Sequence, residues 1–517
     1  MSGTRADQQQ VWLLVATFLV ALAGLIYELI AATLSSYLLG DSVRQFSLVI
    51  GVYLAAMGLG AWLSRFVTHA LPGFVWAQIL LGVLGGFMAP VLYFSYAFLG
   101  EVDLPLYLML IAIGALAGME LPLIARVLNE IGLPEFRFEN VLSVDYVGAL
   151  AASIAFPILI VPYLGLMSAS LVFGCMNLAV AGLSLWIFRQ TATRLTVITW
   201  ACALLISLVA LAGAERMVSV VEASLFEDDV ILSEDTPYQH IAITRFRDRT
   251  RLFLDSSIQF DSQDEYRYHE SLVHPAMALA PRAQDILILG GGDGLAAREV
   301  FRHPQVKSVT LVDLDARVTT LFATHPDLTV LNDNALNDPR LTVINQDAWK
   351  FVETNTAAYD VIIADLPDPK SITLSKLYSV EFYAMLVERL SAGGLLAVQS
   401  GSPLFARSGY WSVVHTLQAT RNPVVPGQGL SVLPYHVYVP SFGDWGFTLA
   451  SLRPLTDRPL TDRPLSLPQG LRYLTPQVWR EEQVFGLDSA DLPAAVNSIQ
   501  SHALVGYYND GWDLWFR

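Results

Sequence analysis

Long apolar runs in the first 216 residues constrain the fold of this chain most strongly. A helix needs roughly 20 consecutive apolar residues to span a bilayer. Seven runs of about that length follow one another, at residues 11–37, 43–64, 73–99, 104–128, 141–165, 168–188 and 195–213. Charges are scarce there, because residues 1–216 hold only 8 Lys/Arg and 11 Asp/Glu. The sequence therefore predicts a multi-pass membrane domain of about seven helices over residues 1–216, whose first run is too long for a cleaved signal peptide.

The remainder of the chain has the composition of a soluble acidic domain. Residues 217–517 hold 23 Lys/Arg and 36 Asp/Glu and so carry −13 of the net charge of −16. Nucleic acid is an improbable partner, because its phosphates require a basic surface. An acidic surface suits a cationic small molecule better.

Strand and helix patterns divide this second half into three parts. Short strands at 230–235, 240–246 and 251–255 predict a small antiparallel β subdomain over residues 217–262. A helix is expected at 264–280, and apolar strands are expected at 285–294, 308–315, 340–344, 359–365 and 394–400. Strands that alternate with helices at this spacing predict a Rossmann-like, mostly parallel sheet over 263–450. Residues 451–517 form an extension whose RPLTD repeat (453–465) has a proline every five residues, which favours an extended loop.

A glycine-rich turn follows the first strand of the predicted parallel sheet. Gly290, Gly291, Gly292 and Gly294 surround Asp293 in the sequence GGGDG. The turn differs from the GxGxxG pattern and contains no lysine, so a nucleoside triphosphate is not expected. Asp313 ends the next strand, about where a carboxylate commonly accepts the hydroxyls of a ribose. Together they predict an adenosine-type ligand, with S-adenosyl compounds as the leading class.

Three further carboxylates favour a ligand that carries positive charge. Asp293 lies where methyltransferases hold the methionine end of their donor, and a second acid there suits the purely cationic end of decarboxylated S-adenosylmethionine. Asp365 and Asp368 follow the strand 359–365, at the edge of the sheet where ligands bind. Such a pair could hold a diamine and remove a proton from one of its nitrogens.

Residues 222–480 resemble the spermidine synthase family of polyamine aminopropyltransferases. The resemblance is carried, in order, by Tyr238-Gln239, Gln259, DEYRYHE (264–270), GGGDG (290–294), VDLD (312–315), Gln346-Asp347, DLPDP (365–369) and LYSVEFY (377–383). The apolar first half is similar in hydropathy to the segment found in a membrane-bound branch of that family. Family members commonly form dimers, so a homodimer is possible.

The resemblance implies a role for each matching residue. Asp365 is the implied general base, and Asp368 holds the amine together with Tyr268 or Tyr378. Asp293 binds the donor ammonium and Asp313 the ribose. Asp347, followed by Ala348, contacts the adenine, while Gln239 and His269 line the substrate channel. No metal or other cofactor is implied, because decarboxylated S-adenosylmethionine is a co-substrate; His269 has no partner cluster typical of a metal site.

Four departures from the family pattern concern the amine site more than the reaction. Ser256 and Ala348 each replace a glycine of a DG pair, and Leu366-Pro367 replaces small polar residues. Lys370 begins a segment that replaces a Gly-Pro. The predicted reaction is transfer of an aminopropyl group to putrescine, giving spermidine and methylthioadenosine. Two alternatives stay open: a methyltransferase, and a membrane transporter or sensor of polyamines with a non-catalytic domain.

Three acids within the apolar half, Glu28, Glu120 and Asp145, are costly in a bilayer and predict a cation site, unless they are protonated or pair with Arg126 or Arg44. The arginines suggest a cytoplasmic amino terminus, which with seven spans places residues 217–517 outside. The substrate of the predicted reaction is cytosolic, however. The expected location is therefore the cell inner membrane, with the catalytic domain in the cytoplasm.

Overall fold

The chain forms two compact units, Met1–Val230 and Ile231–Arg517. The computed structural model describes residues 2–39, 42–130, 138–188, 192–226, 228–255, 257–425, 427–453 and 465–515. Most of the RPLTD repeat, residues 454–464, and Ser256 lie outside the described residues.

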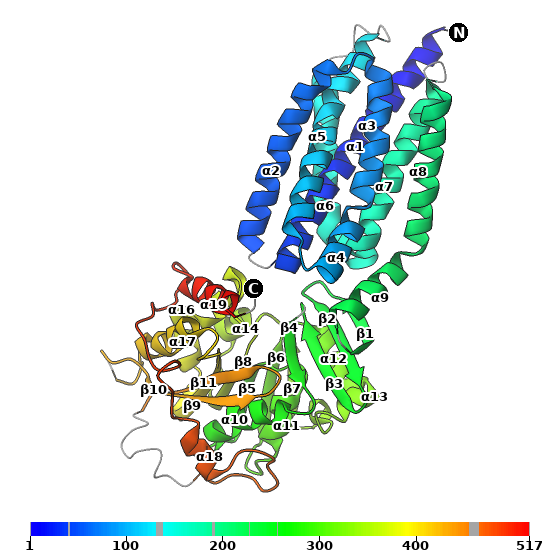
Figure 1. Cartoon of the computed structure of the whole chain (residues 1–517). Coiled ribbons are helices and arrows are strands. Elements are labelled where there is room, and N and C mark those ends of the chain that lie inside the picture. Colours follow the sequence, from blue (N-terminus) through cyan, green and yellow to red (C-terminus); the bar gives the residue numbers. More distant parts are fainter. Residues whose placement is uncertain are drawn as a thin grey trace. The chain divides into compact units, whose positions relative to one another are not determined.

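The first unit is a bundle of long apolar helices (Figure 1). Its helices are α1 (Ser2–Leu39), α2 (Ser42–Leu63), α3 (Ala70–Gly86), α4 (Met88–Leu99), α5 (Asp103–Glu130), α6 (Phe138–Ala155), α7 (Val161–Ile187), α8 (Arg194–Ala212) and α9 (Ala214–Leu225). Within the described residues, six helical stretches are long and apolar enough to cross a membrane by length and composition. One of these, Glu139–Ile187, has 49 residues and contains two of the seven predicted runs. The two runs are separated at Gly165, whose φ of 65° and ψ of 167° interrupt the helix.

Glycines allow α2 and α5 to pack closely. A Cβ on Gly60 would lie 1.8 Å from the carbonyl oxygen of Ala115, and a Cβ on Gly118 would lie 2.0 Å from that of Met57. Small residues at such crossings are typical of helices that pack in membranes. The first unit also continues beyond residue 216, because Met217 and Val218 of α9 pack on the buried cluster that includes Met167 and Leu171.

The second unit begins with a four-stranded sheet of order β1-β2-β3-β4. Its strands are β1 (Asp229–Asp235), β2 (His240–Phe246), β3 (Arg249–Leu254) and β4 (Ser257–Asp261). The β2–β3 and β3–β4 pairs are antiparallel. The three predicted strands are confirmed, and β4 is an addition that the sequence analysis did not predict.

A seven-stranded sheet of order β10-β11-β9-β8-β5-β6-β7 forms the centre of the second unit. Its strands are β5 (Asp285–Gly290), β6 (Ser308–Asp313), β7 (Leu341–Asn345), β8 (Tyr359–Asp365), β9 (Leu390–Gly401), β10 (Ser431–Val439) and β11 (Gly443–Ser451). The five strands β5 to β9 are joined by parallel pairs, which confirms the predicted Rossmann-type sheet. The hairpin β10–β11, paired antiparallel to β9, was not predicted.

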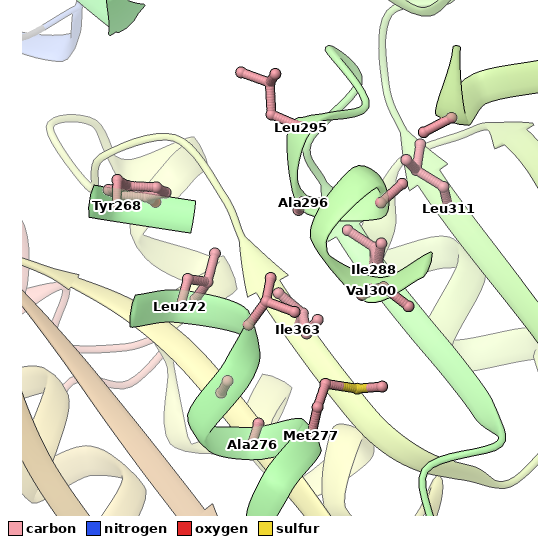
Figure 2. Packing of buried hydrophobic residues seen from close by; sticks show 14 of the residues in the cluster. Tyr268, Leu272, Ala276, Met277, Ile288, Leu295, Ala296, Val300, Leu311 and Ile363 are labelled. Atoms are coloured by element: carbon pink, nitrogen blue, oxygen red, sulfur yellow. The ribbon is translucent and has the colours of Figure 1, made fainter. Parts of the chain in front are cut away.

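Helices cover both faces of this sheet. They are α10 (Glu265–Leu279), α11 (Leu295–Phe301), α12 (Ala316–Thr324), α13 (Pro326–Thr329), α14 (Ala348–Thr354), α15 (Ile372–Ser375), α16 (Val380–Val387), α17 (Arg407–Ala419), α18 (Pro476–Glu481) and α19 (Ala503–Asp513). Successive residues of a strand face opposite sides, so Ile288 packs with α10 and α11 (Figure 2), whereas Leu289 packs with α14 and α16. Burial on both faces explains why these strands appear in the sequence as continuous apolar runs.

The register of the sheet brings the polar ends of several strands to one edge. Gly290 at the end of β5 lies opposite Asp365 at the end of β8. On the other side of β5, Asp313 ends β6 opposite Asn345 of β7. The glycine turn and two of the predicted site acids therefore lie side by side.

Candidate active site

The glycine turn after β5 lies against both neighbouring strand ends. A Cβ on Gly290 would lie 1.9 Å from the carbonyl oxygen of Asp365, and a Cβ on Gly292 would lie 2.6 Å from Oδ2 of Asp313. Gly290, Gly291 and Gly294 also adopt positive φ angles of 80°, 64° and 79°. Only glycine combines this conformation with such close contacts.

Asp313 is held in place by the backbone. The N–H of Gly292 donates to Oδ2 at 3.0 Å, and the N–H of Asp315 donates to Oδ1 at 2.9 Å. Burial nevertheless raises the pKa of Asp313 to about 6, because the loss of hydration outweighs these hydrogen bonds. Each carboxylate oxygen retains a lone pair, which the predicted contact with a ribose requires.

Asp293 is a buried acid inside the glycine turn. Its Oδ1 accepts the backbone N–H of Leu295 at 2.9 Å, and its backbone carbonyl accepts Nδ2 of Asn332 at 2.8 Å. Burial raises the pKa of Asp293 to about 6, and the positive charge of His269 opposes this rise. A cationic ligand beside Asp293 would replace part of the hydration that the carboxylate has lost.

His269 carries a positive charge because it is hydrogen-bonded to the ionised side chain of Glu265, which in turn pairs with Arg298. Its Nδ1 donates to Oε2 of Glu265 at 2.8 Å, and Glu265 is also bound by Arg298 at 2.8 Å. Burial lowers the pKa of His269, but the hydrogen bond and charge of Glu265 outweigh burial and raise it to about 9. The imidazolium therefore offsets part of the negative charge of Asp293 and Asp365.

Asp365 is oriented by a tyrosine of α10. Tyr268 donates from Oη to Oδ1 of Asp365 at 2.7 Å. The Tyr268 ring is itself packed edge-on against Phe447, with centroids 5.1 Å apart. Oδ2 of Asp365 lies 3.2 Å from the position of a Cβ on Gly291, so it faces the glycine turn. Burial raises the pKa of this carboxyl, while His269 and the Tyr268 hydrogen bond lower it.

Asp368 is bound by two residues that the sequence analysis did not assign to the site. Tyr508 of α19 donates from Oη to Oδ2 at 2.5 Å, and Gln399 of β9 donates from Nε2 to Oδ1 at 3.2 Å. Burial raises the pKa of Asp368, and the Tyr508 hydrogen bond is the strongest influence that lowers it. Gln399 is a polar residue at the end of an apolar strand, a signal that could have revealed it. Tyr508 lies 140 residues from Asp368, and no local pattern marks it.

Tyr378 supports the loop that carries Asp368, but its hydroxyl does not contact this carboxylate. Its Oη donates toward the carbonyl oxygens of Leu366 at 2.9 Å and Pro367 at 3.1 Å, and it accepts Nε2 of Gln399 at 2.6 Å. Tyr268 likewise binds Asp365 and not Asp368. The hydroxyl that contacts Asp368 is that of Tyr508.

Lys370, one of the departures from the family pattern, places a cation near the end of this loop. Its Nζ donates to Oγ of Ser257 in β4. Burial raises the pKa of both Asp368 and Asp255, and the charge of Lys370 opposes part of that rise. The small β-sheet and the Asp365–Pro369 loop are thus linked through a lysine that borders the predicted amine site.

The other predicted residues lie at the rim formed by the ends of β6 and β7. Gln239 donates from Nε2 to Oδ2 of Asp315 at 3.1 Å, next to Asp313. Asp347 caps α14 and forms an ion pair with Lys376 at 3.1 Å, and the hydrogen bond and charge of Lys376 outweigh burial and lower the pKa of Asp347. Ala348, the first residue of α14, is buried. Within the described residues, no group of three or more His, Cys, Asp or Glu side chains could hold a metal ion.

Comparisons with known proteins identify the family of this chain. Residues 265–458 match the family model described as the spermine/spermidine synthase domain. A polyamine aminopropyltransferase of Leptospira interrogans is 41% identical over 98% of this chain and 99% of its own length. One of Oceanobacillus iheyensis is 37% identical over 99% of this chain and 100% of its own. A crystal structure of spermidine synthase in complex with the transition state analogue AdoDATO is 25% identical, covers 50% of this chain and 85% of its own, and has a TM-score of 0.44.

These relatives match the apolar first unit as well as the second, since the alignments cover nearly the whole of both chains. The chain is an enzyme of the spermidine synthase type and belongs to the polyamine aminopropyltransferase family.

Proposed function

We propose that this enzyme transfers the aminopropyl group of decarboxylated S-adenosylmethionine to putrescine or a closely related diamine, with Asp365 as the general base. The amine nitrogen forms a bond to the methylene carbon next to the sulfonium. The carbon–sulfur bond breaks, and its electron pair stays on sulfur to give neutral methylthioadenosine. The proton released by the nitrogen passes to Asp365. The donor is a co-substrate, so the reaction requires no metal or redox cofactor.

The orientation of Asp365 is the observation that carries this proposal. Tyr268 donates to Oδ1, and Oδ2 is left directed to the glycine turn, which also carries Asp293. An alkylamine has a pKa near 10 and is almost entirely ammonium at pH 7. A fixed carboxylate can accept its proton as attack proceeds, which typically contributes ~10²–10⁴-fold to the rate.

The surrounding acids support placement of two cations in one pocket. Asp293 is suited to the aminopropyl ammonium of the donor, and Asp313 to its ribose. Asp368, oriented by Tyr508 and Gln399, is suited to the ammonium of the acceptor. Holding the nitrogen and the sulfonium carbon in line converts a bimolecular step into one between oriented groups.

The test is Asp365→Asn in the purified full chain, assayed for methylthioadenosine. We expect kcat to fall by roughly 10²–10⁴-fold. Tyr268→Phe, which keeps the carboxylate and removes only its hydroxyl partner, should lose less. An unchanged rate in Asp365→Asn would exclude this base, and S-adenosylhomocysteine as product would indicate a methyltransferase.

We also propose that the first unit spans the inner membrane and that residues Ile231–Arg517 lie in the cytoplasm. Six described helical stretches have sufficient length and apolar character to cross a membrane, and the proposed donor is a cytosolic metabolite. A reporter that is active only in the cytoplasm should be active when it is fused after Arg517. Activity of a reporter that works only outside the membrane would contradict this topology.

A further inference from the structure

A cavity inside the first unit collects three acids from three different helices. It has a volume of about 120 Å³ and is lined by residues of α1, α2, α5 and α6. The acids are Glu28 of α1, Glu120 of α5 and Asp145 of α6. The exposed fractions of Glu28 and Glu120 are only 8% and 5%. These acids are far apart in the sequence, and the fold brings all three to one cavity.

Among the residues that line the cavity, no protein cation balances these acids. Glu28 and Asp145 make no hydrogen bond or ion pair with any residue that the structure describes, while Glu120 accepts a hydrogen bond from Nε2 of Gln78. The residues that line the cavity include no lysine, arginine or histidine. Arg126, considered as a partner from the sequence, instead donates to the carbonyl oxygens of Ser64 at 3.0 Å and Val67 at 2.7 Å.

The chemistry of the cavity favours an extended organic cation over a metal ion. Ca²⁺ or Mg²⁺ would require about six oxygen ligands around one point, and no three acidic, cysteine or histidine side chains of the described residues converge in this way. Apolar side chains also line the cavity, among them Val20, Leu25, Met57 and Leu121. Acids that enter a partly apolar cavity from three different helices suit a molecule with a charge at each end of a methylene chain.

The size of the cavity agrees with such a molecule. A water molecule needs roughly 10–15 Å³ of a cavity, so the 120 Å³ here have room for roughly eight to twelve water-sized groups. Ionisable groups within an apolar bundle are costly and are typically retained for binding or transport. We propose that this cavity binds an alkyl diammonium ion, with its ammonium groups on Glu28, Glu120 and Asp145 and its methylene chain against the apolar walls.

The test measures how many molecules of radiolabelled putrescine bind to one full chain in lipid nanodiscs, by equilibrium dialysis. The wild-type chain should bind two, one in this cavity and one in the proposed catalytic site. The variant Glu28→Gln/Glu120→Gln/Asp145→Asn should bind one and should still form methylthioadenosine at the wild-type rate. The matched control Glu101→Gln/Asp103→Asn/Glu139→Gln, which removes exposed acids of the same unit, should still bind two.

The two sites can fail independently. Asp368→Asn should remove only the catalytic site. Suppose that the wild-type chain binds one putrescine, and that this molecule is lost in the triple variant and kept in Asp368→Asn. That result would support the cavity site and contradict the proposed acceptor site. An unchanged number of bound molecules in a triple variant that elutes as a single species would overturn the cavity proposal. The cavity proposal would also be overturned if sodium or butylamine displaced the cavity-bound putrescine as effectively as another diamine does. Should the triple variant aggregate, Glu28→Gln alone should weaken the cavity site at least tenfold, and unchanged affinity would refute it.

Discussion

Replacing Asp293 by asparagine should make the second unit more stable while it impairs binding of the donor. Asp293 is buried, and burial raises its pKa from 3.8 to about 6. The folded protein therefore disfavours the ionised carboxylate that it needs at neutral pH. Since one pKa unit corresponds to about 1.4 kcal/mol, this ionisation costs the folded state about 3 kcal/mol at pH 8.

The sign of the pH dependence follows from the direction of this pKa change. Below pH 3.8 the carboxyl is protonated in both the folded and unfolded states and costs nothing. As the pH rises from 3.8 through 6, the unfolded chain ionises first, and the folded state loses stability relative to it. The penalty is about half developed at pH 5 and complete above pH 7. Asparagine keeps an oxygen for the N–H of Leu295 and never ionises, so it removes the penalty.

Thermal unfolding of the full chain in detergent, followed at pH 4, 5 and 8, tests this reasoning. With roughly 2–4 °C per kcal/mol for a domain of this order of size, Asp293→Asn should raise the unfolding temperature of the second unit by roughly 6–12 °C at pH 8. About half of this gain should remain at pH 5 and little at pH 4. Asp248→Asn, which neutralises an exposed acid of the same unit, is the control and should change nothing.

Two ligands separate stability from function in the same assay. Methylthioadenosine lacks the aminopropyl ammonium and should stabilise both proteins equally. Decarboxylated S-adenosylmethionine should stabilise the wild-type protein more than Asp293→Asn. The reasoning is refuted if Asp293→Asn unfolds at or below the wild-type temperature at pH 8, or if its gain is the same at pH 4 and pH 8.

Three further substitutions test other contacts of the site. Tyr508→Phe removes a hydrogen bond to a charged group, worth about 1.5–3 kcal/mol. It should raise the KM for the amine by roughly 10-fold or more, with little change in the KM for the donor. An unchanged KM for the amine would exclude Tyr508 from the site. Gly292→Ala places a Cβ 2.6 Å from Oδ2 of Asp313, so steady-state kinetics should show a higher KM for the donor, and an effect confined to the amine would contradict the assignment of Asp313. Lys370→Ala removes a cation near Asp368 and should lower the KM for putrescine by roughly fivefold, as expected for about 1 kcal/mol of repulsion; a higher KM would show that Lys370 assists binding.

The parallel strands were predictable because strands buried on both faces consist of consecutive apolar residues. Strand 359–365 was predicted with the bounds that β8 has, and all its residues from Tyr359 to Ala364 are buried. Strand β10 was missed because its burial is irregular: it contains Pro434 and several half-buried positions. Such a strand depends on pairing with β11 and on the contacts of its buried face, which no local window of sequence displays.

The acids of the site were predictable because each follows a strand or a glycine turn. Their hydrogen-bond partners were not, because they come from remote elements; Tyr268 was expected beside the amine and not as the partner of Asp365. Gln399 and Tyr508 reach Asp368 from β9 and from α19 in the C-terminal extension. The contact of Tyr508 depends on how α19 packs against the rest of the second unit. Such long-range packing has no local sequence motif near residue 508.

The partners of the acids distinguish the two places where this chain gathers negative charge. In the second unit, Asp293, Asp313, Asp365 and Asp368 each accept a hydrogen bond from a backbone N–H or a side chain of fixed position. Attack by a nitrogen in line with a breaking bond, with transfer of its proton to a carboxylate, requires such orientation because the rate depends on geometry. In the cavity of the first unit, Glu28 and Asp145 have apolar neighbours and no polar partner among the described residues. Carboxylates without a fixed partner can follow a mobile cation but cannot hold one nitrogen in line for attack. We therefore expect the first unit to bind a cation and the second to transform one, which is why loss of the cavity acids should leave the formation of methylthioadenosine intact.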